Sequence, residues 1–215
     1  MKRTLSEQDR NRLDALVADV EKRTNSQIVL AVIQRSDIYA ELPWKAFALG
    51  ASFIGLLGFI LDLLFYGWDS VVTLPIAMLG ILSGGAFFAL LTVLIPGFAK
   101  QFLPAIRAEV EVKQYAQSLF LSRELFATSK RTGILVLISL FERKVVILPD
   151  KGLIDQLPTD TMQSMIRVMT LFLKKGEIRK AFEAGLEQLS HSLRIDVHRA
   201  GKNELSDEII EEKGV

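Results

Sequence analysis

The stretch TGILVLISLFERKVVILPDKG, which runs from Thr132 to Gly152, holds two apolar runs separated by a charged turn. The run ILVLISL lacks alternating polar residues, which is typical of a strand buried on both faces of a sheet. After the turn FERK, the run VVIL returns and predicts a second, antiparallel strand. Pro149 cannot continue a central strand, so we expect the sheet to end there. Glu142, Arg143 and Lys144 are expected to form a solvated hairpin turn.

Segments on both sides of this hairpin supply further elements of the same domain. The run QIVLAVI, from Gln27 to Ile33, predicts a buried strand, and it buries useful surface only if it joins the later pair. Helices are expected where apolar residues recur at helical spacing, and their starts are Ser6 as an N-cap, Pro104, Asp160 as an N-cap with Gln163, and Ile178. The sequence therefore predicts an α/β fold with a small central sheet of about three or more strands, flanked by helices.

Two long apolar runs interrupt this domain. They extend from Ala46 to Tyr66 and from Val71 to Ile95, and each is long enough to cross a hydrocarbon core of about 30 Å as a helix. The alternative is a pair of helices buried in a large soluble core, for which near-continuous apolar runs of this length are unfavourable. Because the link GWDS is short, we expect the two spans to form a transmembrane hairpin inserted into the α/β domain.

Aromatic and basic residues give the predicted hairpin an orientation. Trp44 lies at one edge of the apolar region, and Tyr66 and Trp68 lie at the other, where amphipathic rings favour the membrane interface. Asp62 lies a turn from Tyr66 and is expected to reach that interface. Basic residues flank the spans and are missing from the link; they are Arg35, Lys45, Lys100, Arg107 and Lys113. This bias predicts a two-pass protein of the cytoplasmic (plasma) membrane with both termini in the cytoplasm.

The composition excludes several classes of function. A net charge of +1, without a basic stripe interleaved with aromatic residues, gives no reason to expect a nucleic-acid partner. The chain has no cysteine, so disulfides, thiol catalysis and cysteine-based zinc sites are excluded. The opening MKRTLSEQDRNRL lacks the apolar core of a signal peptide. The expected partners are the lipid bilayer and other membrane proteins.

These patterns predict four parts of the chain. Residues 1–40 are the first part of a cytoplasmic α/β domain, residues 44–95 are the transmembrane hairpin, and residues 100–200 are the remainder of the domain. Residues 201–215 form an acidic tail that we expect to be poorly ordered.

Three stretches carry a resemblance to a known family: TNSQIVLAVI, TGILVLISLFERKVVILPD and PTDTMQSMI. With them the chain resembles the TPM domain family, which includes thylakoid-lumen, photosystem II repair and acetylcholine-receptor-modulating proteins. The resemblance implies an α/β sandwich with a small sheet. It also implies weak acid phosphatase activity or calcium binding through acidic loops in some members, and assembly or repair of membrane complexes in others. The family's Gly-x-Gly-Leu-Glu loop reads differently here, since Pro149–Ile154 keeps one glycine and has isoleucine in place of the glutamate.

Asp150, Asp155 and Asp160 lie five residues apart in one loop that leads into a helix. Carboxylates in such a loop could bind Ca²⁺ or Mg²⁺, with Asp150 as the candidate catalytic carboxylate. Structural roles are the alternative, with Asp150 as a turn residue beside Pro149 and Asp160 as the helix cap. His191 and His198 are expected to be solvated or capping residues.

Two hypotheses follow. In the first, the protein is a membrane-tethered interaction or maintenance module for membrane proteins, without catalysis or a cofactor of its own. In the second, it is a metal-assisted, acid-phosphatase-like enzyme that uses the acidic loop 150–160.

Overall fold

The computed structural model describes residues 5–64, 73–193 and 209–214, and the chain divides into two compact units. The first unit combines residues 1–37 with residues 108–215, and the second is the segment between them, Ile38–Arg107. The chain therefore leaves the first unit early, builds the second and returns to complete the first.

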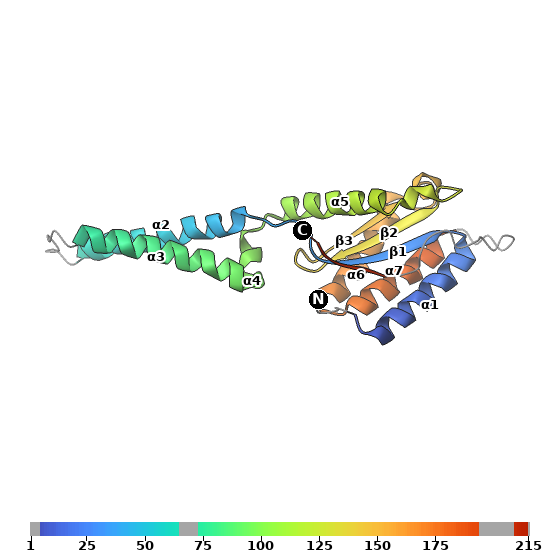
Figure 1. The fold of residues 1–215 in the computed structure, drawn as a ribbon, viewed down its shortest axis with the longest axis horizontal. Helices are drawn as coiled ribbons and strands as arrows, with labels where there is room; N and C mark the ends of the chain where they lie inside the picture. The colour runs from blue at the N-terminus through green and yellow to red at the C-terminus, as the bar shows by residue number, and fades with distance from the viewer. Residues whose placement is uncertain (1–4, 65–72, 194–208, 215) are drawn as a thin grey trace. The chain divides into compact units, whose positions relative to one another are not determined.

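A four-stranded sheet in the order β3-β2-β1-β4 forms the centre of the first unit (Figure 1). β1 (Gln27–Arg35) is parallel to β2 (Gly133–Ser139), and β2 is antiparallel to β3 (Lys144–Pro149). These pairings confirm the predicted hairpin and the expectation that the early strand joins it. β4 (Ile210–Gly214) adds a second parallel partner on the other side of β1.

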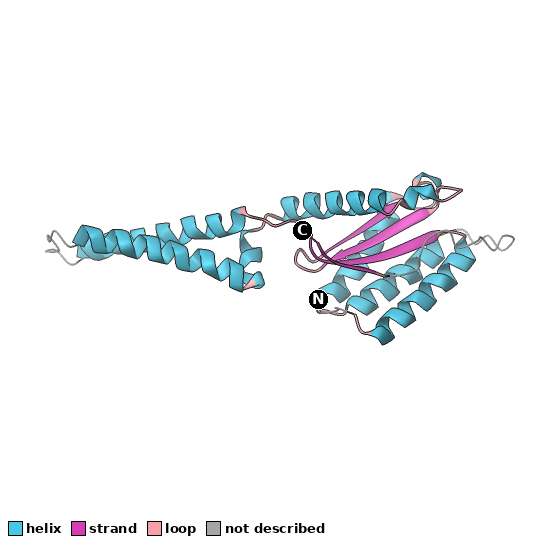
Figure 2. Cartoon of the chain, in the orientation of Figure 1, coloured by secondary structure: helices cyan, strands magenta, loops and turns pink. Residues whose placement is uncertain are grey.

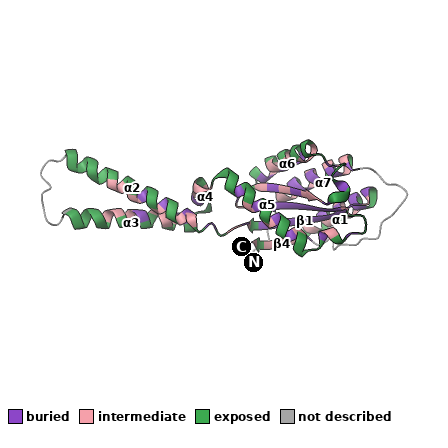
Figure 3. Ribbon diagram, turned by 90° about the horizontal axis from the view of Figure 1, so that it is seen from above, coloured by how far each residue is buried: buried purple, intermediate pink, exposed green. Residues whose placement is uncertain are grey.

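Helices cover both faces of this sheet (Figure 2). One face packs against α1 (Glu7–Thr24), α6 (Thr159–Lys174) and α7 (Ile178–Ser192), and the other packs against α5 (Ala105–Ser122). Successive residues of β1 and β2 alternate between the two apolar clusters, so both strands are buried on both sides (Figure 3). The predicted α/β fold is confirmed.

Two helix ends differ from the expectation. Asp160 is not an N-cap, because α6 already begins at Thr159 with Pro158 before it and no side-chain cap. The apolar spacing of residues 105–128 predicts one continuous helix, but α5 ends at Ser122, since Glu124 adopts a left-handed backbone (φ 52°) and a short 3-10 turn, η2 (Leu125–Ala127), follows. The cap at Ser6 is confirmed, with Asp9 completing a capping box.

The acidic tail is the main correction to the predicted organisation. Residues Ile210–Gly214 form β4, so the expectation of a poorly ordered tail is wrong for this segment. Residues 201–208 lie outside the described residues. The remaining predicted domain boundaries stay predictions.

The second unit contains the two long apolar helices, α2 (Glu41–Leu64) and α3 (Thr73–Leu94), and the short α4 (Pro96–Ala99). Both long helices have a mean hydropathy of 2.1 over their most apolar stretch, of which only 6 % and 11 % is buried. They are long and apolar enough to cross a membrane. Trp44 is 73 % exposed on α2, and Asp62 is also exposed, whereas Tyr66 and Trp68 lie outside the described residues.

Glycine allows α2 and α3 to approach closely. A Cβ atom on Gly50 would lie 2.8 Å from Phe88 Cγ and 2.9 Å from the carbonyl oxygen of Gly84. One on Gly84 would lie 2.4 Å from Ile54 Cγ1. Because glycine has no side chain, the backbone of each helix can approach the facing helix closely at these positions.

The substitution Gly50→Val is expected to push the two helices apart, because one of the colliding atoms belongs to the backbone of α3. We expect a loss of about 1–2 kcal/mol, in the range of overpacked cores. Thermal unfolding in detergent measures it. Gly58→Val is the matched control, since nothing lies within 4 Å of a Cβ at that position. Equal melting temperatures for the two variants would contradict the described packing.

Candidate functional site

Asp150, the candidate catalytic carboxylate, lies where β3 ends and is the N-cap of the 3-10 turn η3 (Lys151–Leu153). Its Oδ1 accepts hydrogen bonds from the Lys151 backbone N–H (2.7 Å) and the Arg131 guanidinium (3.0 Å). Its Oδ2 accepts from Arg131 Nε at 2.7 Å. The Asp150 side chain is only 4 % exposed, while that of Arg131 is 48 % exposed. Both carboxylate oxygens are therefore engaged in holding the loop after β3.

The close packing of this loop against residues 130 and 131 explains why position 152 is a glycine. A Cβ atom on Gly152 would lie 2.4 Å from the carbonyl oxygen of Lys130, so glycine is needed for the close approach of the two segments. The Arg131 guanidinium also lies 5.7 Å from the centroid of the Phe126 ring. The hydrogen bonds from Arg131 to Asp150 raise the pKa of the guanidinium.

The other predicted site residues do not join Asp150. Asp155 and Asp160 are exposed, and no group of three or more potential metal-ligating side chains occurs within residues 5–64, 73–193 and 209–214. His191 is exposed near the end of α7, and His198 lies outside the described residues. The metal-binding role of Asp150, Asp155 and Asp160 remains a prediction.

Glu142 is a polar residue whose position the sequence did not indicate. It was expected in a solvated turn, but it is 4 % exposed. Its Oε1 accepts hydrogen bonds from the backbone N–H of Ser36 (2.9 Å) and from Ser36 Oγ (2.6 Å), while the Ser139 hydroxyl contacts Oε2. The expectation was wrong because a carboxylate can be buried when several donors converge on it. Glu142 thus joins the end of β2 to the residue that follows β1.

Two hollows in the first unit are lined by polar and charged side chains. One, of about 380 Å³, lies between α5 and β4 and is lined by Tyr115, Ser118, Leu119, Ser122, Arg123 and Glu212. Glu212 accepts hydrogen bonds from the Tyr115 hydroxyl (2.7 Å) and from Arg123 NH2 (2.9 Å). Burial and the adjacent Glu212 carboxylate raise the pKa of Tyr115, so its hydroxyl remains a proton donor.

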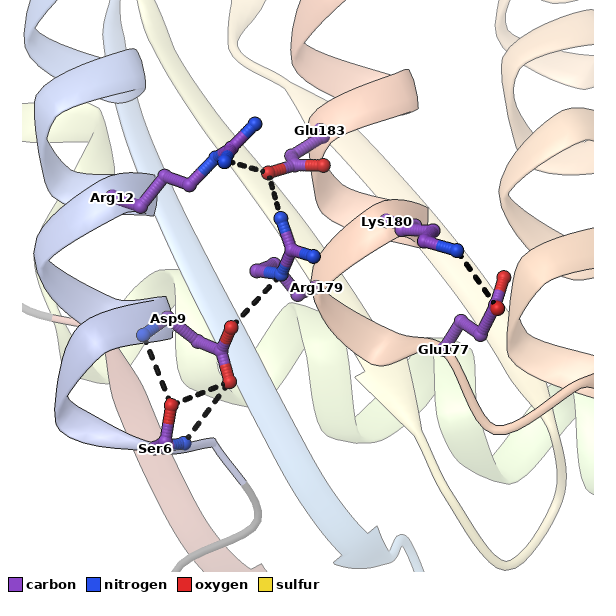
Figure 4. Close-up of polar contacts among 7 residues, drawn as sticks. All are labelled: Ser6, Asp9, Arg12, Glu177, Arg179, Lys180 and Glu183. Carbon is purple, nitrogen blue, oxygen red and sulfur yellow. Dashed lines mark hydrogen bonds and ion pairs between the residues drawn. The ribbon is translucent and has the colours of Figure 1, made fainter.

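The second hollow, of about 300 Å³, lies where α1 and α7 begin and includes Asp9, Arg179 and Lys180. Figure 4 shows its polar network. Arg179 donates to Asp9 (2.8 Å) and to Glu183 (2.7 Å), which also pairs with Arg12 at 2.7 Å. Every charge in this chain of contacts faces an opposite charge, so the network ties the two helices together.

Asp9 supplies a pH-dependent part of this stability. The hydrogen bond from the Ser6 hydroxyl, followed by weaker effects including the Arg179 charge, lowers its pKa below 3.8. Its contribution is therefore present above the unfolded-state pKa and is lost as the pH falls through the lowered folded-state pKa. Asp9→Asn should cost about 0.5–1 kcal/mol at neutral pH, the size of a helix cap, and flatten the acid limb of the stability curve. Urea unfolding between pH 3 and pH 7 measures it, and an unchanged pH dependence would contradict the role of Asp9.

The comparisons with known proteins agree with this fold. A family model described as the TPM domain matches residues 102–192. The structure of the BA42 protein from the psychrophilic bacterium Bizionia argentinensis is similar, with a TM-score of 0.60 and 14 % identity, covering 98 % of this chain and 97 % of that one. This similarity shows the fold alone. No curated protein matches the sequence. Residues 102–192 thus carry a TPM domain, built on a sheet whose remaining strands come from outside the matched segment.

Proposed function

We propose that the protein is an integral membrane protein whose TPM domain binds and helps to maintain other membrane proteins. The observation that carries this proposal is the apolar surface of α2 and α3. Their most apolar stretches are almost entirely uncovered by the protein itself, which is the state of a helix pair that meets lipid. A domain interrupted by such a pair is held close to a bilayer and to its proteins.

The residues that precede and follow the inserted segment belong to the folded core of the first unit. On the entry side, Ser36 follows β1 and is held by Glu142. On the return side, α5 packs onto the sheet through Val112, Ala116 and Leu119. The chain therefore leaves and re-enters the first unit at ordered residues, which suits a domain that meets its partners at the membrane.

The basic residues on both sides of the hairpin support a location of the TPM domain in the cytoplasm, with the link at Gly67–Ser70 on the other side of the cytoplasmic membrane. The absence of cysteine from the sequence allows a direct test. With Ser70→Cys as the only cysteine, a membrane-impermeant maleimide should label intact cells. With Asp155→Cys it should label only permeabilised cells, because Asp155 is exposed on the domain. Labelling of Asp155→Cys in intact cells would overturn the orientation.

The binding role is tested by photo-crosslinking in native membranes. A photoreactive residue at an exposed position of the TPM domain, such as Leu171, should repeatedly capture the same membrane proteins. A second variant carries the photoreactive residue at Leu121, exposed on the helix that covers the opposite face of the sheet, so that both faces are sampled. Capture of no integral membrane protein from either face would overturn the proposed function.

A further inference from the structure

Among residues 5–64, 73–193 and 209–214, the strand that covers the outer edge of β1 is β4, which is short and rich in charge. β4 pairs with β1 in parallel, from Ala31 opposite Ile210 to Arg35 opposite Gly214. An uncovered strand edge presents unpaired N–H and C=O groups, which any extended segment can satisfy. The edge of β1 therefore needs an occupant, and the identity of that occupant depends on the side chains around it.

An arginine side chain lies on each face of the sheet beside this edge, Arg10 on one face and Arg123 on the other. Glu211 turns toward α1, where its Oε1 lies 2.7 Å from Arg10 NH2 and accepts from the Leu5 N–H at 3.3 Å. Glu212 turns toward α5, where Tyr115 and Arg123 hold it. Because neighbouring strand residues point to opposite faces, a segment with two consecutive acidic residues satisfies both arginines at once.

The ion pairs that fix β4 beside β1 leave part of their arginine partners unused or exposed to water. Arg10 Nε is buried without a hydrogen-bond partner among the described residues, so Glu211 leaves part of this guanidinium unused. On the other face the Arg123 side chain is 50 % exposed, and an ion pair so open to water contributes little to stability. Glu212 also leaves the hollow of about 380 Å³ beside Ser118 and Ser122 unfilled.

We propose that the edge of β1, between Arg10 on one face and Tyr115 with Arg123 on the other, is a binding site for an extended acidic segment of a partner protein, and that β4 is the chain's own occupant, which the partner displaces. The mode is strand addition, in which main-chain hydrogen bonds give affinity and side-chain contacts on alternate faces give specificity. The matching segment has apolar residues followed by two consecutive acidic residues, as in Ile209–Glu212. This inference rests on the proposed function, which makes the partner a membrane protein.

The test must weaken the resident strand first, because a tethered segment competes at an effective concentration of about millimolar. The full chain with Glu211→Gln and Glu212→Gln is purified in detergent, and its fold is checked by circular dichroism. A fluorescently labelled peptide of residues 205–214 is the probe, and fluorescence anisotropy measures its binding. A peptide with glutamine at both acidic positions is the matched control.

We expect the acidic peptide to bind this variant about tenfold more tightly than it binds the wild-type chain, and about tenfold more tightly than the glutamine peptide does. Adding Arg10→Ala and Arg123→Ala should remove this difference between peptides. Equal binding of the two peptides, or equal binding by the variant and the wild type, would overturn the proposal.

A second measurement needs no weakened strand. A fluorophore on Lys213→Cys, at an exposed position of β4 in an otherwise cysteine-free chain, should gain mobility when the acidic peptide is added at millimolar concentration. An immobile label at saturating peptide would also overturn the site. Both peptide measurements are independent of the membrane. If they fail while crosslinking still captures membrane proteins, the strand-binding site is overturned and the proposed function is not. If crosslinking fails while the peptide binds as expected, the proposed function is overturned and the peptide-binding site is not.

Discussion

Glu142→Ala is expected to lower the free energy of unfolding of the α/β unit by about 3–5 kcal/mol, because it removes the acceptor of three buried hydrogen bonds at about 1–3 kcal/mol each. These donors are the Ser36 N–H, the Ser36 hydroxyl and the Ser139 hydroxyl. Ser36 is 5 % exposed and Ser139 is fully buried, so both side chains are shielded from bulk water.

Two substitutions separate this effect from the loss of a charge. Glu142→Gln keeps one carbonyl oxygen as an acceptor and should cost about 1–2 kcal/mol. Glu109→Gln removes the charge of a side chain that is 72 % exposed in its pair with Lys144, and should cost less than about 0.5 kcal/mol. Urea unfolding followed by far-ultraviolet circular dichroism is the measurement, since both tryptophans belong to the segment 44–68 rather than to the sheet. A Glu142→Ala variant as stable as Glu109→Gln would show that the turn is solvated after all.

Asp150→Ala is expected to lower the same free energy by about 2–3 kcal/mol, since it removes two charge-assisted hydrogen bonds and a cap. The cost stays below that of Glu142→Ala because Arg131 is half exposed and can turn to water. Asp150→Asn keeps an acceptor for the Lys151 N–H and should cost about 1 kcal/mol. Asp155→Asn, in the same loop but exposed, is the control and should change stability little.

The same variants test the metal-binding hypothesis. Arg131 and the Lys151 N–H occupy both oxygens of Asp150, and a cation would have to displace a guanidinium that already carries positive charge. We therefore expect the melting temperatures of the wild type and of Asp150→Asn to respond equally to millimolar Ca²⁺ or Mg²⁺. A stabilisation by either cation that Asp150→Asn abolishes would make Asp150 a metal ligand and restore the phosphatase-like alternative.

The sequence was most informative where one physical effect dominates. The apolar runs of β1 and β2 could only be buried strands, and their pairing followed because neither could bury its faces alone. The long runs that became α2 and α3 were equally clear, since length and hydropathy identify them without tertiary information. The capping box of Ser6 and Asp9 is local, so it too was readable.

The sequence was least informative where a polar residue depends on a distant partner. Glu142 follows β2 in a short turn, but one of the residues that bury it is Ser36, which lies 106 residues away in the sequence. The pairing of Glu211 and Glu212 with α1 and α5 likewise turns an acidic tail into a strand, against its local composition. The only hint in the sequence is the pair Ile209–Ile210, which is out of place in a solvated tail.

The strand order has a consequence for synthesis of the protein. β1 is translated early, but its first partner, β2, begins at Gly133 and its second, β4, at Ile210. Until then β1 carries a long apolar edge that nothing in the nascent chain can cover, and closing so large a loop is slow. The ribosome therefore delivers both apolar helices before the sheet can close. A chain stalled between the two helices would expose the apolar faces of β1 to chaperones and proteases.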